Sequence, residues 1–265
     1  MPLYTDQLKR VIEISAVPQR IISLVPSQTE LLFDLGLDKE TIGITKFCVH
    51  PESWFRNKQR VGGTKDVNVD LVSSLKPDLI IANKEENKKE QVEALEKAAP
   101  VWISDVNNIV SAFDMMQSIG EITGKQEKAK TLIREIQNGL VSLSQNKPIK
   151  NYRTAYLIWR DPYMTVGGDT FIHDMLRLIG FQNVFGDVKR YPQVTTEEII
   201  SKNTELILLS TEPYPFKQKH IDELQVQLPA AKIVLVDGEI FSWYGSRMLH
   251  AAGYLNELMK HINSE

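Results

Sequence analysis

The sequence lacks several features that define common protein classes. It has one cysteine, Cys48, so no disulfide can form within the chain. No apolar run approaches 18 residues, so we expect no segment that spans a membrane. The 31 basic residues do not outnumber the 34 acidic ones and form no patch, so we expect no nucleic-acid partner. With 42% apolar and 25% charged residues, the chain has the composition of an ordinary globular protein.

Motifs of common enzyme classes are also missing. There is no G-x-S-x-G sequence, and Gly62-Gly63-Thr64-Lys65 lacks the spacing of a phosphate-binding P-loop. Gly167-Gly168-Asp169-Thr170 could cradle a phosphate at a helix start, but a tight turn with Asp169 as N-cap explains it equally well. We therefore expect no enzymatic activity and no cofactor of the protein's own; a metal-dependent lyase is the enzymatic alternative.

The first residues, MPLYTDQLKRVIEI, contain no basic stretch followed by an apolar one, so they do not form a secretory signal. As written, the chain is expected in the cytoplasm. If a leader was removed, it is expected in the periplasm or another extracytoplasmic place. We expect a monomer.

Short apolar runs alternate with segments of helical pattern along the chain. Strands are predicted at 20–25, 41–45, 79–83, 100–104, 154–159, 206–210 and 232–237. Helices are predicted at 29–36, after a capping box at Ser27–Glu30, and at 109–123, 171–179 and 246–262, with a hairpin at 3–14. The alternation predicts the α/β class with a largely parallel sheet, on which ligands bind at the carboxyl ends of the strands.

A long amphipathic helix is predicted at Gln126–Gln145, between Gly124 and Pro148. Twenty residues of helix span roughly 30 Å, about the width of a small domain. We therefore predict a lobe at 1–125, a connecting helix at 126–147 and a second lobe at 148–265. The alternative is an ordinary surface helix on a single α/β domain.

An internal repeat supports the two lobes. Residues 67–85 align with residues 194–212 at an offset of 127, with identical residues at 67/194, 74/201, 79/206, 80/207 and 85/212. Acidic residues coincide at 70/197 and 78/205. Chance similarity is the alternative, because a helix followed by a strand is common; we favour two similar α/β lobes.

Four segments carry a resemblance to a known family. RIISLVPSQTELLFDLG, LKPDLIIA, YPQVTTEEI and WYGSR are similar to segments of the cobalamin-binding and ferric-siderophore-binding proteins of ABC importers, and the similarity runs from Arg20 to the C-terminus. The resemblance implies two Rossmann-like lobes of the class III periplasmic-binding-protein type. In that class a single long rigid helix joins the lobes, the ligand lies in a cleft between them, and an ABC permease is the partner.

Candidate ligand contacts come from loops that follow the predicted strands. The resemblance places Phe47 and Tyr191 where related proteins hold aromatic rings against a corrin. A corrin is a flat apolar face with amide arms, which stacked rings and a few polar groups suit. The candidates are Phe47, His50, Trp54, Lys65, Glu85 and Glu86 from the first lobe, and Trp159, Tyr163, Tyr191, Trp243, Tyr244 and Arg247 from the second. Packing in the core is the alternative for Trp159, Trp243 and Tyr244.

Cys48 and His50 suggest a metal site, but a complete site needs three or four ligands, which Glu85 and Glu86 could supply. His50 could instead be an axial ligand to cobalt, or only a hydrogen-bonding group. We predict a corrinoid such as cobalamin as the bound ligand, with a ferric chelate second. The third hypothesis is a cytoplasmic sensor or ligand chaperone that works without a permease. The histidines at 173, 220, 250 and 261 are expected to be solvated.

Asp70 and Glu197 are equivalent in the internal repeat, and both lie near predicted helix starts. An acidic residue there stabilises a helix through its dipole, which is the structural explanation. The family resemblance implies a second role, in which such acids dock onto basic sites of the two permease subunits.

Overall fold

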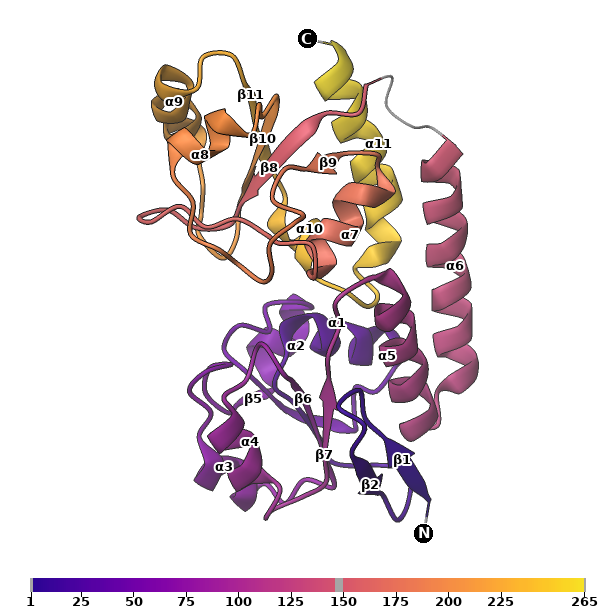
Figure 1. Ribbon diagram of the computed structural model, residues 1–265. Coiled ribbons are helices and arrows are strands. Elements are labelled where there is room, and N and C mark those ends of the chain that lie inside the picture. The colour runs from indigo at the N-terminus through magenta and orange to yellow at the C-terminus, as the bar shows by residue number, and fades with distance from the viewer. Residues whose placement is uncertain (1, 146–149, 265) are drawn as a thin grey trace. The chain divides into compact units, whose positions relative to one another are not determined.

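The computed structural model describes residues 2–145 and 150–264, which form two compact units (Figure 1). Unit 1 comprises Met1–Val106, Val110–Glu135 and Tyr244–Arg247. Unit 2 comprises Asn107–Ile109, Ile136–Trp243 and Met248–Glu265. The long helix α6 (Gln126–Gln145) has the predicted bounds up to Gln145, and its residues divide between the units after Glu135. The remainder of the predicted connecting helix, 146–147, lies outside the described residues. The expected two-lobed α/β class is confirmed.

Unit 1 is built on five parallel strands in the order β5-β4-β3-β6-β7. The strands are β3 (Ile21–Ser23), β4 (Thr41–Ile44), β5 (Gln59–Arg60), β6 (Leu79–Asn83) and β7 (Val101–Ser104). The helices between and after them are α1 (Pro26–Asp34), α2 (Glu52–Asn57), α3 (Val69–Ser74), α4 (Lys89–Leu95) and α5 (Ile109–Ile122). Every residue of β3, β6 and β7 is buried, as expected for parallel strands covered on both faces.

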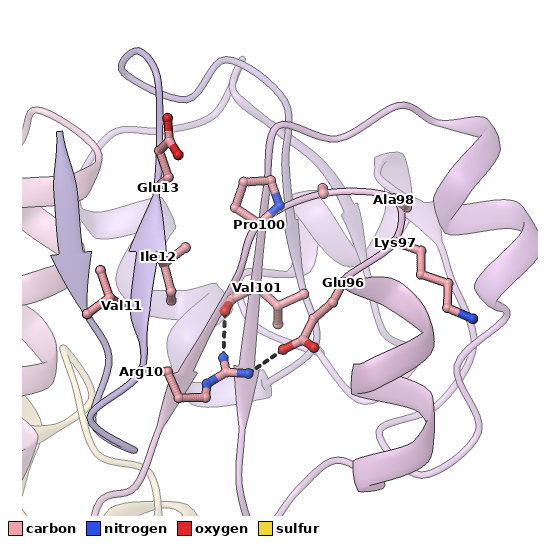
Figure 2. A pocket seen from close by; sticks show the side chains of 10 residues that line it. Arg10, Val11, Ile12, Glu13, Glu96, Lys97, Ala98, Pro100 and Val101 are labelled. Carbon is pink, nitrogen blue, oxygen red and sulfur yellow. Dashed lines mark hydrogen bonds and ion pairs between the residues drawn. The ribbon is translucent and has the colours of Figure 1, made fainter. Parts of the chain in front are cut away.

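The predicted N-terminal hairpin forms from β1 (Leu3–Thr5) and β2 (Val11–Glu13), and its turn covers the edge strand β7. The backbone N–H of Gln7 donates to the carbonyl oxygen of Ile103 at 3.1 Å. The guanidinium of Arg10 donates to the carbonyl oxygen of Val101 at 2.8 Å and pairs with Glu96 (Figure 2). An uncovered edge would offer these carbonyls to another chain, so the hairpin protects the sheet. The hollow beside Arg10, about 540 Å³, lies at the amino end of β7.

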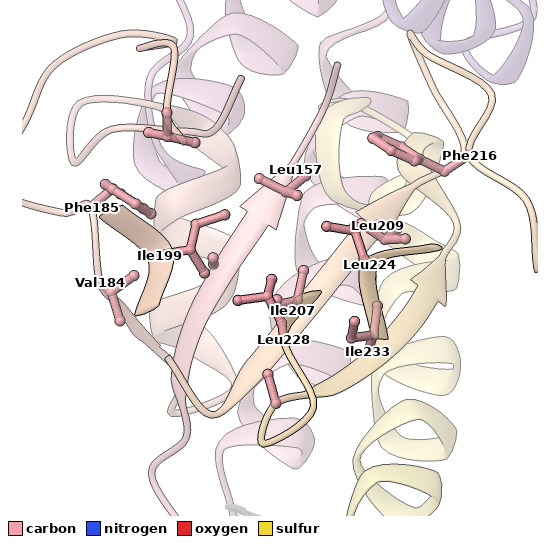
Figure 3. Close-up of a cluster of buried hydrophobic side chains, with 13 residues drawn as sticks. Leu157, Val184, Phe185, Ile199, Ile207, Leu209, Phe216, Leu224, Leu228 and Ile233 are labelled. Atoms are coloured by element: carbon pink, nitrogen blue, oxygen red, sulfur yellow. The ribbon is translucent and has the colours of Figure 1, made fainter. Parts of the chain in front are cut away.

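Unit 2 has four parallel strands in the order β11-β10-β8-β9. The strands are β8 (Arg153–Leu157), β9 (Gln182–Asn183), β10 (Leu206–Ser210) and β11 (Lys232–Val236). The helices are α7 (Phe171–Leu178), α8 (Thr196–Ser201), α9 (Gln218–Gln227), α10 (Gly238–Ser242) and α11 (Met248–Ser264). Apolar residues from strands and helices form one core, in which Leu209, Phe216 and Leu224 lie together (Figure 3).

The internal repeat is confirmed in the secondary structure. An offset of 127 places α3 on α8 and β6 on β10 with every bound coincident. The strand order β4-β3-β6-β7 in unit 1 corresponds to β9-β8-β10-β11 in unit 2. The two units therefore share one topology over four strands.

The repeat extends to single side chains at the start of the central strands. The guanidinium of Arg20, just before β3, donates to the carbonyl oxygens of Leu75 and Lys76 that follow α3. The guanidinium of Arg153, at the start of β8, donates to the equivalent carbonyl oxygens of Lys202 and Asn203 that follow α8. Each arginine thus ties the end of a helix to the neighbouring strand.

Two predicted helix caps are wrong. Helix α1 begins at Pro26, and its N-cap, Val25, makes no side-chain capping bond, so Ser27–Glu30 is not a capping box. Proline favours the first helical position, which places Ser27 inside the helix. Helix α7 is capped by Thr170, whose Oγ1 accepts from the N–H of His173 at 3.3 Å, and not by Asp169.

Among the helices of residues 2–145 and 150–264, none is both long and apolar enough to span a membrane.

Candidate functional site

Two asparagines shape the loops at the carboxyl edge of the unit 1 sheet. At the end of β6, Oδ1 of Asn83 accepts from the N–H groups of Glu85 at 2.8 Å and Glu86 at 3.0 Å. Nδ2 of Asn87 donates to the carbonyl oxygen of Thr64 at 2.9 Å. Both asparagines are buried, so these bonds replace lost hydration and fix the loop after β6 beside the loop at Gly62–Lys65.

Three predicted contacts lie together on these loops. The exposed Lys65 donates from Nζ to the carbonyl oxygen of Glu85. Burial raises the pKa of Glu86, and the nearby charge of Lys65 opposes that rise. Lys65 is therefore an exposed cation beside a carboxyl group that is more readily protonated than usual.

Phe47 is the exposed ring of unit 1 that the sequence predicts. It follows β4, and 51% of the residue is exposed. Nζ of Lys46 lies 5.3 Å from the centroid of the ring. A Cβ atom on Gly63 would lie 3.1 Å from Cε2 of Phe47, so glycine provides the space in which the ring sits. Lys46 was not predicted, although its position next to Phe47 is a signal for a cation on the same loop.

The predicted Cys/His/Glu metal site is wrong. Cys48 is fully buried, and its Sγ lies 3.0 Å from Oγ1 of Thr29 and 3.2 Å from Oγ1 of Thr45. Burial raises the pKa of the thiol, which disfavours the thiolate that binds metals. No group of three or more His, Cys, Asp or Glu residues in the described chain could hold a metal ion. His50 is half-buried, and its role as an axial ligand stays a prediction.

Trp54 is a core residue, so its prediction as a stacking ring is wrong. Only 2% of it is exposed, and its ring packs edge-on against Phe33 with centroids 5.5 Å apart. Nζ of Lys58 lies 4.9 Å from the Trp54 ring centroid. Trp54 lies on the short helix α2, whose pattern was too brief to show which face is buried.

Arg247 forms an ion pair within the protein. Its Nε and Nη2 contact Oε2 and Oε1 of Glu30 on α1 at 2.9 and 2.8 Å, a two-point ion pair. Each side chain is 14% exposed. Burial raises the pKa of Glu30, and Arg247 opposes the rise. Arg247 and Tyr244 belong to unit 1, so their assignment to the second lobe is corrected.

Trp243 and Tyr244 are 8% and 9% exposed, which contradicts the expectation of open aromatic rings. Nε1 of Trp243 donates to Oε1 of Glu212 at 2.8 Å. The neighbouring Gly245 has φ of 107°, a conformation that glycine adopts without strain, and this turn separates the tyrosine from Arg247. These residues shape the segment before α11.

The aromatic side chains of unit 2 that could contact a ligand lie on the loops that follow β8, β9 and β10. Trp159 is 40% exposed and meets Tyr214 edge-on, with centroids 5.7 Å apart. Bridges from Met164 to Trp159 and to Gln193 place the loop after β8 beside the loop of Tyr191. The guanidinium of Arg190 lies 5.5 Å from the ring centroid of the half-buried Tyr191. Tyr163 is also half-buried. Tyr214 was missed, although a tyrosine between two prolines just after a strand is a recognisable loop signal.

Asp70 and Glu197 occupy the same place in the repeat. Each is the second residue of its helix, α3 or α8, and each is exposed. Bonds from backbone N–H and from Thr195 lower the pKa of Glu197, which keeps that carboxylate charged. Both acids are therefore accessible to a partner, and their docking role stays a prediction.

A family profile, curated sequences and a solved structure all indicate similarity to substrate-binding proteins. A family profile described as "Periplasmic binding protein" matches residues 21–232. An uncharacterized ABC transporter substrate-binding lipoprotein, YvrC of Bacillus subtilis, is 31% identical over 213 residues, 77% of this chain and 67% of that one. A vitamin B12-binding protein of Vibrio vulnificus is 28% identical over 205 residues, 75% of this chain and 74% of that one. A crystal structure of a possible iron-binding (periplasmic solute-binding) protein from Staphylococcus epidermidis superposes with a TM-score of 0.78 at 26% identity, covering 93% of this chain and 99% of that one.

Proposed function

The chain belongs to the periplasmic binding protein family, whose members are in general not enzymes, and we propose that it captures a corrinoid for an ABC importer. The observation that carries the proposal is an exposed aromatic ring at the carboxyl edge of each sheet, Phe47 in unit 1 and Trp159 in unit 2. Ligands of parallel sheets bind at that edge. A flat apolar macrocycle with polar arms matches such rings and the polar groups beside them.

A calorimetric titration of the purified protein tests the proposal. The probes are cyanocobalamin, cobinamide and a ferric hydroxamate, each titrated up to 100 µM. Burying a few hundred Å² of apolar surface at about 25 cal/mol per Å² contributes several kcal/mol, which after ordering costs supports submicromolar binding. We expect that result for a corrinoid; saturable binding of the hydroxamate alone would overturn the corrinoid assignment.

A ferric chelate is the second candidate ligand. The resemblance in fold and sequence to the possible iron-binding protein of Staphylococcus epidermidis supports it. Lys46 beside Phe47 and Lys65 beside Glu85 would attract an anionic chelate. The affinity of such a ligand should fall steeply with salt, whereas that of a neutral corrinoid should not.

His50 is the proposed axial ligand of the corrinoid cobalt, and aquocobalamin reports this directly. Imidazole is a good ligand for transition metals, and its coordination would shift the visible spectrum of the bound corrinoid. We expect the shift in the wild-type protein and its absence in His50→Ala. Unshifted spectra at full occupancy of the wild-type protein would remove the ligation and leave the corrinoid assignment standing.

We also propose that the partner is an ABC permease and that Asp70 and Glu197 mark the docking face. Their exposure and their equivalence in the repeat support this, since paired acids can steer association with a basic surface. The name of YvrC as a lipoprotein supports a place outside the cytoplasmic membrane, where such a receptor would work.

Charge reversal tests the docking role. Asp70→Lys with Glu197→Lys should abolish transport in cells that depend on the ligand, while the affinity of the purified protein for that ligand stays unchanged. Asp66→Lys with Lys189→Glu changes exposed charges elsewhere and is the control. Normal transport by the Asp70/Glu197 double variant would exclude the docking role.

A further inference from the structure

His220 is buried at the start of α9, which contradicts the expectation of a solvated side chain. Only 3% of the residue is exposed. Its Nδ1 accepts a hydrogen bond from the backbone N–H of Lys217 at 2.8 Å. An accepting Nδ1 requires that the proton of the neutral ring sit on Nε2, which lies 3.5 Å from the hydroxyl of Tyr214. The imidazole therefore contacts both ends of the segment at 214–217.

Ring contacts continue from His220 to the exposed edge of unit 2. The centroid of the Tyr214 ring lies 5.5 Å from that of His220 and 4.8 Å from that of Phe216. Phe216 is 3% exposed and belongs to the core of unit 2 (Figure 3), so it anchors one side of Tyr214. Tyr214 also meets Trp159 edge-on. A change at His220 can thus reach Trp159 through a single intervening ring.

We propose that His220 is a positioning residue, which in its neutral form holds Tyr214 against Trp159 and so shapes the aromatic surface that the solute contacts. This inference rests on the proposed function, because Trp159 and Tyr214 are taken as ligand contacts. The imidazole supplies an acceptor for Lys217 N–H and a packing face for Tyr214. Protonation would replace the acceptor with a second N–H donor and break the bond to Lys217.

The charged groups around His220 favour the neutral ring. Burial lowers the pKa of His220, and the cations Lys219, Arg160 and Lys217 lower it further. Glu223 acts in the opposite direction, but it is paired with Arg160 at 2.7 Å. The unfolded chain therefore binds a proton near pH 6.5 before the folded protein does, so this site stabilises the fold above that pH and loses its contribution as pH falls.

Two variants separate positioning from simple packing. In His220→Asn the side-chain oxygen can accept from Lys217 N–H, as Nδ1 does, but the side chain does not titrate. In His220→Ala both the acceptor and the packing face are lost. The probe is cyanocobalamin, titrated at pH 7.5 and pH 4.5, with circular dichroism to confirm that each variant is folded. Acrylamide quenching of Trp159, taken as the difference between each protein and its Trp159→Phe counterpart, is measured without ligand.

At pH 7.5 His220→Asn should bind cyanocobalamin within about twofold of wild type, because its amide oxygen keeps the hydrogen bond to Lys217 N–H. His220→Ala should bind about fivefold more weakly at both pH values, and quenching of its Trp159 should increase. Wild-type affinity together with unchanged Trp159 quenching in His220→Ala would overturn the proposal. If the wild-type protein binds no cyanocobalamin, the corrinoid assignment fails. The positioning role of His220 is then tested by quenching alone, and unchanged quenching of Trp159 in His220→Ala would refute that role.

Discussion

At the scale of single residues, several groups that look suited to a ligand are already bound within the protein. Arg247 is held at two points by Glu30, and the Trp243 indole donates to Glu212. Of the rings predicted as ligand contacts, Phe47 and Trp159 stay exposed to solvent. Residue type thus indicates which chemistry is possible, whereas partners and burial decide where that chemistry is accessible.

The Glu30–Arg247 pair provides a prediction about stability. Replacing Arg247 by Met removes two charge-assisted bonds and leaves a largely buried carboxylate, so the free energy of unfolding should fall by about 2 kcal/mol. Arg247→Lys keeps the charge but not the two-point geometry, so its free energy of unfolding should fall by less than that of Arg247→Met. Urea unfolding followed by circular dichroism measures both.

Arg56→Met is the matched control, because Arg56 pairs with Glu52 on the surface, where both side chains are more than 70% exposed. Surface pairs contribute little, so this change should stay within about 0.5 kcal/mol. Equal losses from Arg247→Met and Arg56→Met would show that the Glu30 pair is not a structural anchor.

At the scale of elements, the repeated helix-turn-strand unit explains why much of the fold was predictable. Strands β6 and β10 were predicted with their observed bounds, since each is an apolar run bounded by polar residues. The six-residue α2 and two-residue β9 were not predicted, because a pattern that short has no measurable period. Helix α9 was also missed, and with it the burial of His220, which depends on rings that arrive from other loops.

The turn after each repeated helix gives a second prediction. Lys76 follows α3 with φ of 48°, and Asn203 follows α8 with φ of 50°. Left-handed backbone costs most residues roughly 1–2 kcal/mol, but asparagine adopts it more readily. Lys76→Gly should therefore raise the free energy of unfolding by about 0.5–1 kcal/mol after the added entropy of the unfolded chain.

Asn203→Gly is the internal control for that change and should have little effect, because asparagine already tolerates the conformation. Both variants are compared with wild type by thermal and urea unfolding. A Lys76→Gly protein less stable than wild type would mean that the lysine side chain, and not the backbone, determines the stability of this turn.

At the scale of the whole molecule, the class followed from the alternation of strand and helix patterns, the repeat from the alignment of residues 67–85 with 194–212, and the family from four short segments. The candidate site was predicted only in part. Lys65, Glu85 and Glu86 lie together in unit 1, and their role in binding stays a prediction, whereas Trp54 and Cys48 are core residues. Apolar and aromatic side chains suit both a core and a ligand surface, so sequence pattern alone does not separate the two uses.

The exposed rings at the carboxyl edges of the sheets are proposed to bind a flat solute. A ring that buries on the order of 100 Å² against a ligand contributes about 2.5 kcal/mol, which is roughly 70-fold in Kd. The changes to compare are Phe47→Ala and Trp159→Ala, with Val226→Ala as a control because Val226 is 83% exposed on α9.

The most direct measurement is the calorimetric Kd of cyanocobalamin for these four proteins. Wild type and Val226→Ala should bind with submicromolar Kd, and Phe47→Ala and Trp159→Ala should each lose roughly 50-fold or more in affinity. Wild-type binding that neither ring substitution weakens, or no binding at 100 µM, would contradict this prediction.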